Sequence, residues 1–109
     1  MKSLGDSFSE RVYELLRQVP AGRVTTYGAL ARALGGRAYR AVGQVLRKNP
    51  YAPLVPCHRV VKSDGMIGGF GGERKGVKIE EKIRLLEKEG VVFLNGRVLN
   101  FRKLFWDFS

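Results

Sequence analysis

A stretch rich in proline and glycine, residues 49–76, places the strongest limit on how this chain can fold. No continuous helix can run through it, because proline lacks a backbone donor and clashes with the preceding turn. Loops of this kind, held by rigid elements, are where binding and chemical residues concentrate. We therefore expect an active-site loop over residues 49–76, which contains Pro50, Pro53, Pro56, Gly65, Gly68, Gly69, Gly71, Gly72 and Gly76.

The length and charge of the chain limit its class. Its 109 residues, 44% of them hydrophobic, suffice for one globular domain and are too few for two, so we expect a single domain over residues 1–109. Lysine and arginine outnumber aspartate and glutamate by 20 to 10, which gives a net charge of +10. A nucleic-acid partner is expected of such a charge, although a solvated basic surface has the same composition.

Three helices are predicted before the loop. Ser7 and Glu10 form a capping box that starts the first helix, and Pro20 is expected to end it. Thr25 or Thr26 can cap the second. A glycine turn between two short helices predicts a helix-turn-helix at about residues 25–48, with the later helix as the candidate reader. The segments are a second helix over 27–34, the Gly35-Gly36 turn and a third helix over 37–48.

The chain after the loop combines a helix with a hairpin. A helix ending at Gly90 is expected, with Ile79, Ile83 and Leu86 on one face. Asn95-Gly96 is a strong hairpin signal between residues 91–94 and 97–99. The fold class is therefore predicted as α+β, mostly α: a winged helix-turn-helix-like domain with a small C-terminal β-hairpin as candidate wing. Aromatic residues of the tail are expected to cover the core, or alternatively to form a patch for a partner: Phe101, Phe105, Trp106 and Phe108.

The cysteine and histidine content excludes several kinds of site. One cysteine cannot form an internal disulfide, and one cysteine with one histidine falls short of the four ligands of a structural zinc site. No metal or cofactor is therefore expected. The N-terminus lacks an apolar signal region and no segment reaches membrane-spanning length, so we expect a cytoplasmic protein without a membrane partner. A monomer is expected because no heptad pattern is present.

Cys57 is the candidate nucleophile, within the run Pro56-Cys57-His58-Arg59-Val60. A thiol reacts as the thiolate, and a neighbouring histidine, an arginine and loop amides favour that form. A lone cysteine is also commonly a small buried hydrophobic residue, and a lone histidine is commonly structural.

The predicted third helix is unusually slim. Ala38, Ala41 and Gly43 carry little or no side chain, whereas a helix that reads the major groove projects long polar groups. Glycine inside a helix costs about 1 kcal/mol relative to alanine, so a close approach to a partner would explain Gly43. This pattern indicates minor-groove binding, and on the residues alone Arg40 is a phosphate contact or merely solvated.

Several motifs together resemble one family. The run from Pro56 to Val61 is similar to the active-site signature of the O6-alkylguanine-DNA alkyltransferases, the methylated-DNA–protein-cysteine methyltransferases. The further motifs follow in the same order and spacing, over about residues 8–94: Thr26-Tyr27-Gly28, Arg40-Ala41-Val42-Gly43, Asn49-Pro50, Gly68-Gly69-Phe70-Gly71-Gly72, Leu85-Leu86 and Glu89-Gly90.

The resemblance implies an irreversible repair reaction that each molecule performs once. Cys57 would take the alkyl group from guanine O6, with His58 acting on the thiol through a water and Glu89 fixing the histidine tautomer. Glu89 is disfavoured at a helix C-terminus by typically about 0.3 to 1 kcal/mol, which suggests a use, although a surface glutamate is the ordinary alternative. Arg59 would be a structural ion-pair partner.

The same resemblance implies how double-stranded DNA would be bound. Tyr27 would protonate the departing guanine and help to turn the target phosphate, and Arg40 would fill the gap left by the flipped base, beside Ala41 and Gly43. Asn49 would tie the reading helix to the active-site loop. The base would lie between Leu46 and Phe70, with its O6 near the amide of Gly71 and its amine on the carbonyl oxygens of Cys57 and Val60.

Two departures from the family pattern concern the loop. Phe70 and Gly71 stand where well-known members often have tyrosine and serine, and about five additional residues, near 73–78, precede the last helix. The accepted range of alkyl groups therefore cannot be read from the sequence. Two alternatives are also open: an alkyltransferase-like sensor, in which the cysteine position is usually tryptophan, and a winged-helix transcription regulator, in which the Cys57 motif would have no purpose.

Overall fold

The computed structural model describes residues 7–52, 54–70 and 72–108. It has the predicted α+β class, with short strands set among helices. Two hydrophobic clusters stabilise it, one among the N-terminal helices and one beneath the last long helix and the hairpin. The elements in chain order are α1 (Phe8–Leu16), β1 (Thr25–Thr26), α2 (Tyr27–Ala33), α3 (Tyr39–Arg47), the 3₁₀ turn η2 (Cys57–Arg59), β2 (Val60–Val61), α4 (Val77–Lys88), β3 (Phe93–Leu94), β4 (Arg97–Val98) and α5 (Phe101–Leu104).

Helix α1 starts as predicted but ends earlier. The Ser7 hydroxyl accepts a hydrogen bond from the Glu10 amide at 3.2 Å. The helix ends at Leu16, and not at Pro20, because the amides of Gln18 and Val19 turn back to carbonyls three residues earlier. Such 3₁₀ bonds tighten a last turn, and a residue before proline is disfavoured in the α conformation.

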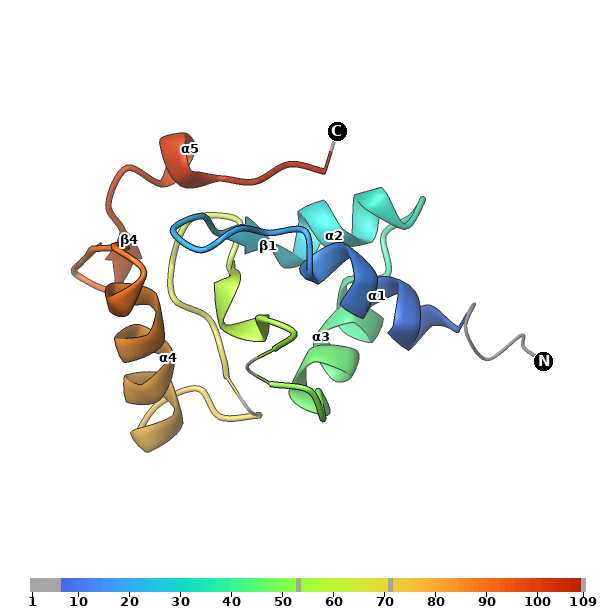
Figure 1. Cartoon of the computed structure of the whole chain (residues 1–109), viewed down its shortest axis with the longest axis horizontal. Helices are drawn as coiled ribbons and strands as arrows, with labels where there is room; N and C mark the ends of the chain where they lie inside the picture. The colour runs from blue at the N-terminus through green and yellow to red at the C-terminus, as the bar shows by residue number, and fades with distance from the viewer. Residues whose placement is uncertain (1–6, 53, 71, 109) are drawn as a thin grey trace.

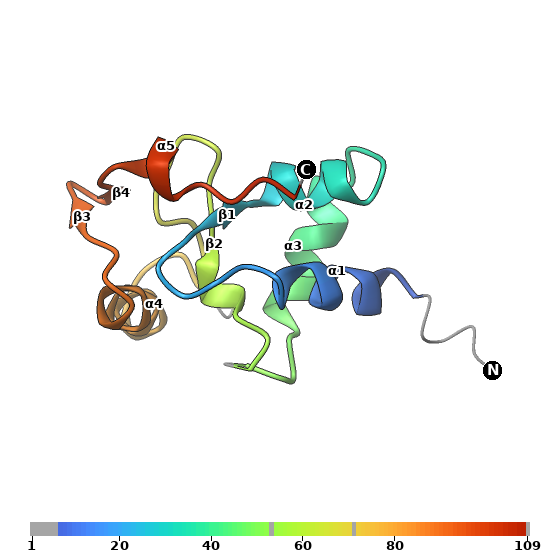
Figure 2. The same cartoon turned by 45° about the horizontal axis from the view of Figure 1, so that its top comes forward.

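Helices α2 and α3 form the expected helix-turn-helix arrangement, packed against α1 (Figures 1 and 2). The Thr26 hydroxyl caps α2 by accepting from the Ala29 amide at 3.0 Å. Gly35, with φ +89°, makes the turn between the helices, a conformation that favours glycine. Helix α3 begins at Tyr39, two residues later than predicted from Arg37, because Ala38 at its N-cap offers no capping side chain.

A parallel strand pair that joins the start of α2 to the loop region was not predicted. Strand β2 pairs with β1, with Thr25 opposite Val60 and Thr26 opposite Val61. Both strands are two residues long, too short to show a periodic pattern in sequence. The pairing fixes η2 between the N-terminal helices and α4, as both views show (Figures 1 and 2).

The C-terminal hairpin is present where Asn95-Gly96 predicted it. Asn95 and Gly96 have φ of 53° and 78°, and strands β3 and β4 pair antiparallel. The hairpin also supports the glycine-rich loop, because the Ile67 amide donates to Gly96 and the Val98 amide to Gly65. It lies beside α4 and α5 (Figure 2).

The aromatic tail covers the core, as expected. Trp106 and Phe108 pack on the N-terminal cluster, and Phe101 packs on the C-terminal cluster. Arg23 holds the tail by donating to the carbonyls of Leu104 and Phe105, at 2.9 and 3.0 Å. No helix among the described residues is long and apolar enough to cross a membrane.

Candidate active site

An open cavity of about 800 Å³ lies between the helix-turn-helix and the glycine-rich loop. Cys57 opens onto it from η2, Tyr27 from the first turn of α2 and Phe70 from the loop. The structure therefore brings together predicted site residues that are 43 positions apart in the chain. Its lining comprises Tyr27, Arg40, Gly43, Gln44, Leu46, Arg47, Cys57, Lys62, Met66, Ile67, Gly68, Gly69, Phe70, Gly72, Glu73 and Arg74.

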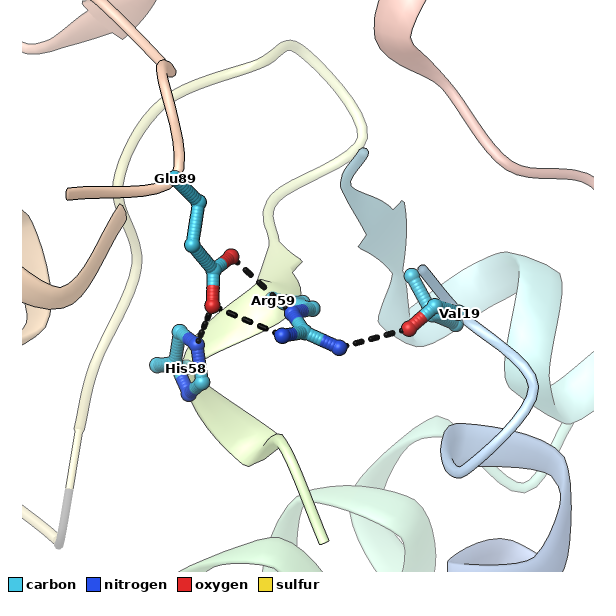
Figure 3. A network of polar contacts seen from close by, with 4 residues as sticks. All are labelled: Val19, His58, Arg59 and Glu89. Carbon is cyan, nitrogen blue, oxygen red and sulfur yellow. Dashed lines mark hydrogen bonds and ion pairs between the residues drawn. The ribbon is translucent and has the colours of Figure 1, made fainter. Parts of the chain in front are cut away.

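A carboxylate joins His58, the residue that follows Cys57 in the chain, to an arginine (Figure 3). Glu89, which caps α4, accepts from His58 Nε2 at 2.9 Å. Arg59 binds the same carboxylate with Nε at 3.0 Å and with a terminal nitrogen at 2.7 Å, while its other terminal nitrogen donates to the Val19 carbonyl at 2.7 Å. The ion pair predicted for Arg59 is thus present, with Glu89 as its partner.

Burial and hydrogen bonding act in opposite directions on the protonation of His58 and Glu89. Burial lowers the pKa of His58 below 6.5, although hydrogen bonding to Glu89 raises it. Burial raises the pKa of Glu89, but hydrogen bonds from Arg59 and His58 outweigh it, so that pKa is lowered overall. At neutral pH the pair is therefore an imidazole and a carboxylate. Because Nε2 must carry the hydrogen donated to Glu89, Nδ1 is left as a proton acceptor.

The Cys57 thiol is protonated at rest. Burial raises its pKa above the ordinary 9.0, while a hydrogen bond from Asn49 and the charge of Lys82 lower it. A partly buried thiol with a raised pKa needs a base before it can attack. The neutral His58 next to it in the chain is suited to accept the proton through a water.

Asn49 connects the end of α3 to the segment that leads to Cys57. Its side-chain amide donates to the Val55 carbonyl at 2.9 Å, and its carbonyl oxygen accepts from the Tyr51 amide at 2.9 Å. A side chain with both a donor and an acceptor is required for this pair of bonds.

Tyr27 faces the cysteine across the cavity. Burial raises the pKa of its phenol, and the charge of Cys57 raises it further, while the Gly69 backbone lowers it. The phenol therefore keeps its proton at neutral pH and can donate it. Gly68 lies next to the Tyr27 hydroxyl and has a φ of +72°, a backbone conformation that favours glycine.

The exposed face of α3 combines basic residues with residues that have small side chains or none. Arg40, Ala41 and Arg47 are exposed, and a Cβ added to Gly43 would meet nothing within 4 Å. The protein itself therefore gives no packing reason for glycine at this position. A close approach by a partner outside the chain would supply the reason.

The predicted base-binding residues stand in different environments. Leu46 and Val60 are buried, and Phe70 is partly exposed at a tight turn closed by two backbone hydrogen bonds with Glu73, at 2.8 and 2.9 Å. Gly71 lies outside the described residues. The carbonyls expected to accept the base amine already accept one bond each, Cys57 from the Val60 amide and Val60 from Lys82. A carbonyl oxygen accepts two, so a further bond fits.

Lys82 was missed by the sequence interpretation. It is 0% exposed, and its ammonium donates to the carbonyls of Val60, Ile67 and Gly69 at 2.7, 2.5 and 3.0 Å. A signal was available, since Lys82 falls on the apolar face of α4 with Ile79 and Leu86. A lysine on such a face is buried only when its charge is satisfied.

Comparison with known proteins shows one consistent likeness. A family profile described as "6-O-methylguanine DNA methyltransferase, DNA binding domain" matches residues 7–91. The methylated-DNA–protein-cysteine methyltransferase of Thermococcus gammatolerans is 51% identical over 85 residues, which are 77% of this chain and 45% of that protein. The DNA base-flipping protein of Thermus thermophilus is 52% identical over 69 residues, 63% of this chain and 46% of that protein. The chain thus spans about half the length of these curated relatives.

A solved structure resembles the chain over nearly its whole length. The S. pombe protein Atl1, in complex with damaged DNA containing O6-carboxymethylguanine, superposes with a TM-score of 0.74 at 32% identity. The match covers 93% of this chain and 95% of that one.

Proposed function

Because the chain belongs to the family of 6-O-methylguanine DNA methyltransferases, we propose that it repairs O6-alkylguanine in double-stranded DNA by taking the alkyl group onto Cys57. The observation that carries the proposal is the position of Cys57 at the cavity, beside a histidine whose tautomer Glu89 fixes.

The proposed reaction is a displacement at the alkyl carbon. The Cys57 proton passes through a water to Nδ1 of His58, and the sulfur then bonds to the carbon as the bond from carbon to guanine O6 breaks. Tyr27 donates a proton to the departing guanine, and the proton held by His58 restores the phenol through solvent. The products are guanine and a thioether, which water does not readily hydrolyse, so each molecule acts once.

Access to the lesion requires that the guanine leave the base stack. We infer that α3 lies in the minor groove, with Ala41 and Gly43 against the sugar and phosphate backbone and Arg40 filling the gap. Exposed basic side chains on α2 and α3 would neutralise phosphates without reading sequence. The complexes with damaged DNA and the base-flipping name of the relatives support this mode.

A lesion sensor is the second candidate, because the likeness over 93% of this chain is to a protein in complex with damaged DNA, and binding of the damage is all that a sensor requires. The two functions predict different products with the same DNA. A sensor binds the lesion and leaves it intact, whereas a transferase acquires the alkyl group. Cys57 favours the transferase, because it provides the nucleophile that a sensor does not need.

The test is to mix the protein with a short duplex that carries one O6-methylguanine and to measure intact and peptide masses. The proposal predicts one added methylene on the peptide that contains Cys57 and restoration of guanine in the duplex. A Cys57→Ala variant should bind the duplex with no change in mass. Tight binding of the lesion by the unaltered protein without a mass change would establish the sensor, and preference for one undamaged sequence would establish a transcription regulator.

A further inference from the structure

The buried amine of Lys82 has no part in the reaction as proposed above, yet it occupies a central place in the fold. Its three hydrogen-bond acceptors belong to two separate segments: Val60 follows the cysteine turn, and Ile67 and Gly69 belong to the glycine-rich loop. Ile67 and Gly69 line the same cavity as Cys57. One side chain from α4 therefore joins the two backbone walls between which the base would bind.

The number of acceptors indicates the charged form. An ammonium has three hydrogens and can satisfy all three carbonyls, whereas a neutral amine has two. Burial lowers the pKa of Lys82 to about 7, and a negative charge on Cys57 raises it. The charged form of Lys82 is thus favoured by its three carbonyl acceptors and by a negative charge on Cys57.

No carboxylate of the described residues is a counter-ion of the Lys82 ammonium. Among the residues that the structure describes, no aspartate or glutamate oxygen lies within ion-pair distance of it. The titratable groups whose charge interacts with that of Lys82 are Cys57 and His58, both on η2. Because His58 is neutral or positive, the cysteine thiolate is the negative charge available to compensate a buried cation.

We propose that Lys82 is a positioning residue of the alkyl-transfer site: its ammonium holds the two backbone walls of the cavity together and serves as the counter-ion of the Cys57 thiolate. The inference rests on the proposed function for its role in repair. The thioether product is neutral, as the resting thiol is, so the Lys82 ammonium has this counter-ion only while the thiolate exists.

The test compares Lys82→Met, which keeps the length of the side chain without the charge, with Lys78→Met, an exposed position one turn earlier on α4. Cys57 is the single cysteine, so its reaction with the chromogenic reagent 4,4′-dithiodipyridine reports on that thiol alone. Rates from about pH 5 to about pH 10 give the midpoint of thiolate formation. Loss of a nearby positive charge should raise this midpoint by about one pH unit or more in Lys82→Met, and Lys78→Met should match the unaltered protein.

Methyl transfer from a duplex with O6-methylguanine provides the second readout. Transfer by Lys82→Met at saturating duplex and neutral pH should fall about tenfold or more, and the deficit should shrink as pH rises and thiolate forms without assistance. A purely structural role would give a deficit that does not change with pH. An unchanged thiolate midpoint in a folded Lys82→Met protein, or a pH-independent deficit, would overturn the inference.

A further measurement keeps Lys82 in place, in case Lys82→Met does not fold. The titration of the Lys82 ammonium is followed by ¹⁵N NMR in the unaltered protein and in Cys57→Ser, because coupling between two charges is reciprocal. The Lys82 midpoint should be lower in Cys57→Ser, and equal midpoints would reject the pairing. If the unaltered protein fails to transfer methyl, the proposed function fails, while the thiol and NMR titrations still decide the charge pairing.

Discussion

Glu89 organises the site at the scale of single residues. Its carboxylate binds His58 with one oxygen and Arg59 with both, and its side chain is only 16% exposed. Charge-assisted bonds in such a setting are strong, and removing one partner leaves the others unpaired. The network thus both positions the histidine and stabilises the junction between α4 and η2.

Glu89→Gln should lower the free energy of unfolding by about 2 kcal/mol, because an amide cannot accept from both neighbours as a carboxylate does. Urea unfolding measures this effect, with the exposed Glu87→Gln as control. The pKa of Glu89 is lowered from 4.5, so its contribution is present above that value and lost as pH falls through the lower, folded pKa. The difference in the free energy of unfolding between Glu89→Gln and the unaltered protein should therefore become smaller as the pH falls into the acid range. A gap that widened in acid would contradict the ion network.

The protonation of His58 predicts the pH dependence of transfer. Because burial holds its pKa below 6.5, the imidazole is neutral and able to accept a proton through the neutral range. The rate constant at saturating duplex should be level near neutral pH and fall only as the pH passes through the lowered pKa of His58, at a pH below 6.5. Binding by Cys57→Ala over the same range separates affinity from chemistry. A rate that is unchanged well below this pH would exclude His58 as the base.

At the scale of elements, α3 has one face that packs into the core and one face that is open to solvent. Val42 and Leu46 pack into the N-terminal cluster, while Gly43 opens onto free space and Arg40 onto solvent. Two short strands and the Asn49 hydrogen bonds hold this helix in register with the cysteine turn. The element that would contact DNA and the element that carries the nucleophile are therefore one connected unit.

Gly43→Ala separates folding from binding. Alanine should raise the free energy of unfolding by about 1 kcal/mol, since the helix gains propensity and the added methyl meets no atom of the protein. The same methyl should weaken duplex binding roughly tenfold if the helix lies close to the DNA backbone. Gly36→Ala, which also faces open space but lies outside the cavity lining, serves as control. Unchanged affinity in Gly43→Ala would contradict close approach by α3.

The sequence predicted the features that depend on residues close together in the chain better than those that depend on contacts between distant segments. Local signals succeeded: Ser7 and Thr26 cap helices, and Asn95-Gly96 turns the hairpin, because each depends on neighbours in the chain. The family motifs selected cavity residues such as Tyr27, Cys57 and Phe70. The pairing of β1 with β2 could not be predicted from spacing, because it depends on contacts between distant segments. The burial of Lys82 was missed although its spacing from Ile79 and Leu86 places it on the apolar face of α4. The winged-helix role of the hairpin and the monomeric state stay predictions.

At the scale of the whole molecule, the net charge of +10 predicts salt-dependent binding. Each phosphate that a basic side chain neutralises releases counter-ions, so affinity falls steeply as salt rises. Arg47→Gln, on the exposed face of α3, should reduce the slope of log affinity against log salt by about one for undamaged duplex. Lys88→Gln, at the exposed last residue of α4, should leave this salt slope unchanged. Equal slopes in all proteins would place the DNA on another face.

Transfer of one alkyl group to one cysteine limits repair to one lesion per protein molecule, and the amount of repair per molecule can be measured. The protein is incubated with excess duplex containing O6-methylguanine, and restored guanine and S-methylated Cys57 are counted over time. If the reaction is stoichiometric, the amount of restored guanine and the amount of S-methylated Cys57 both reach a plateau at one per chain and stay equal. Restored guanine rising steadily beyond that level, or a plateau at zero with the lesion bound, would contradict it.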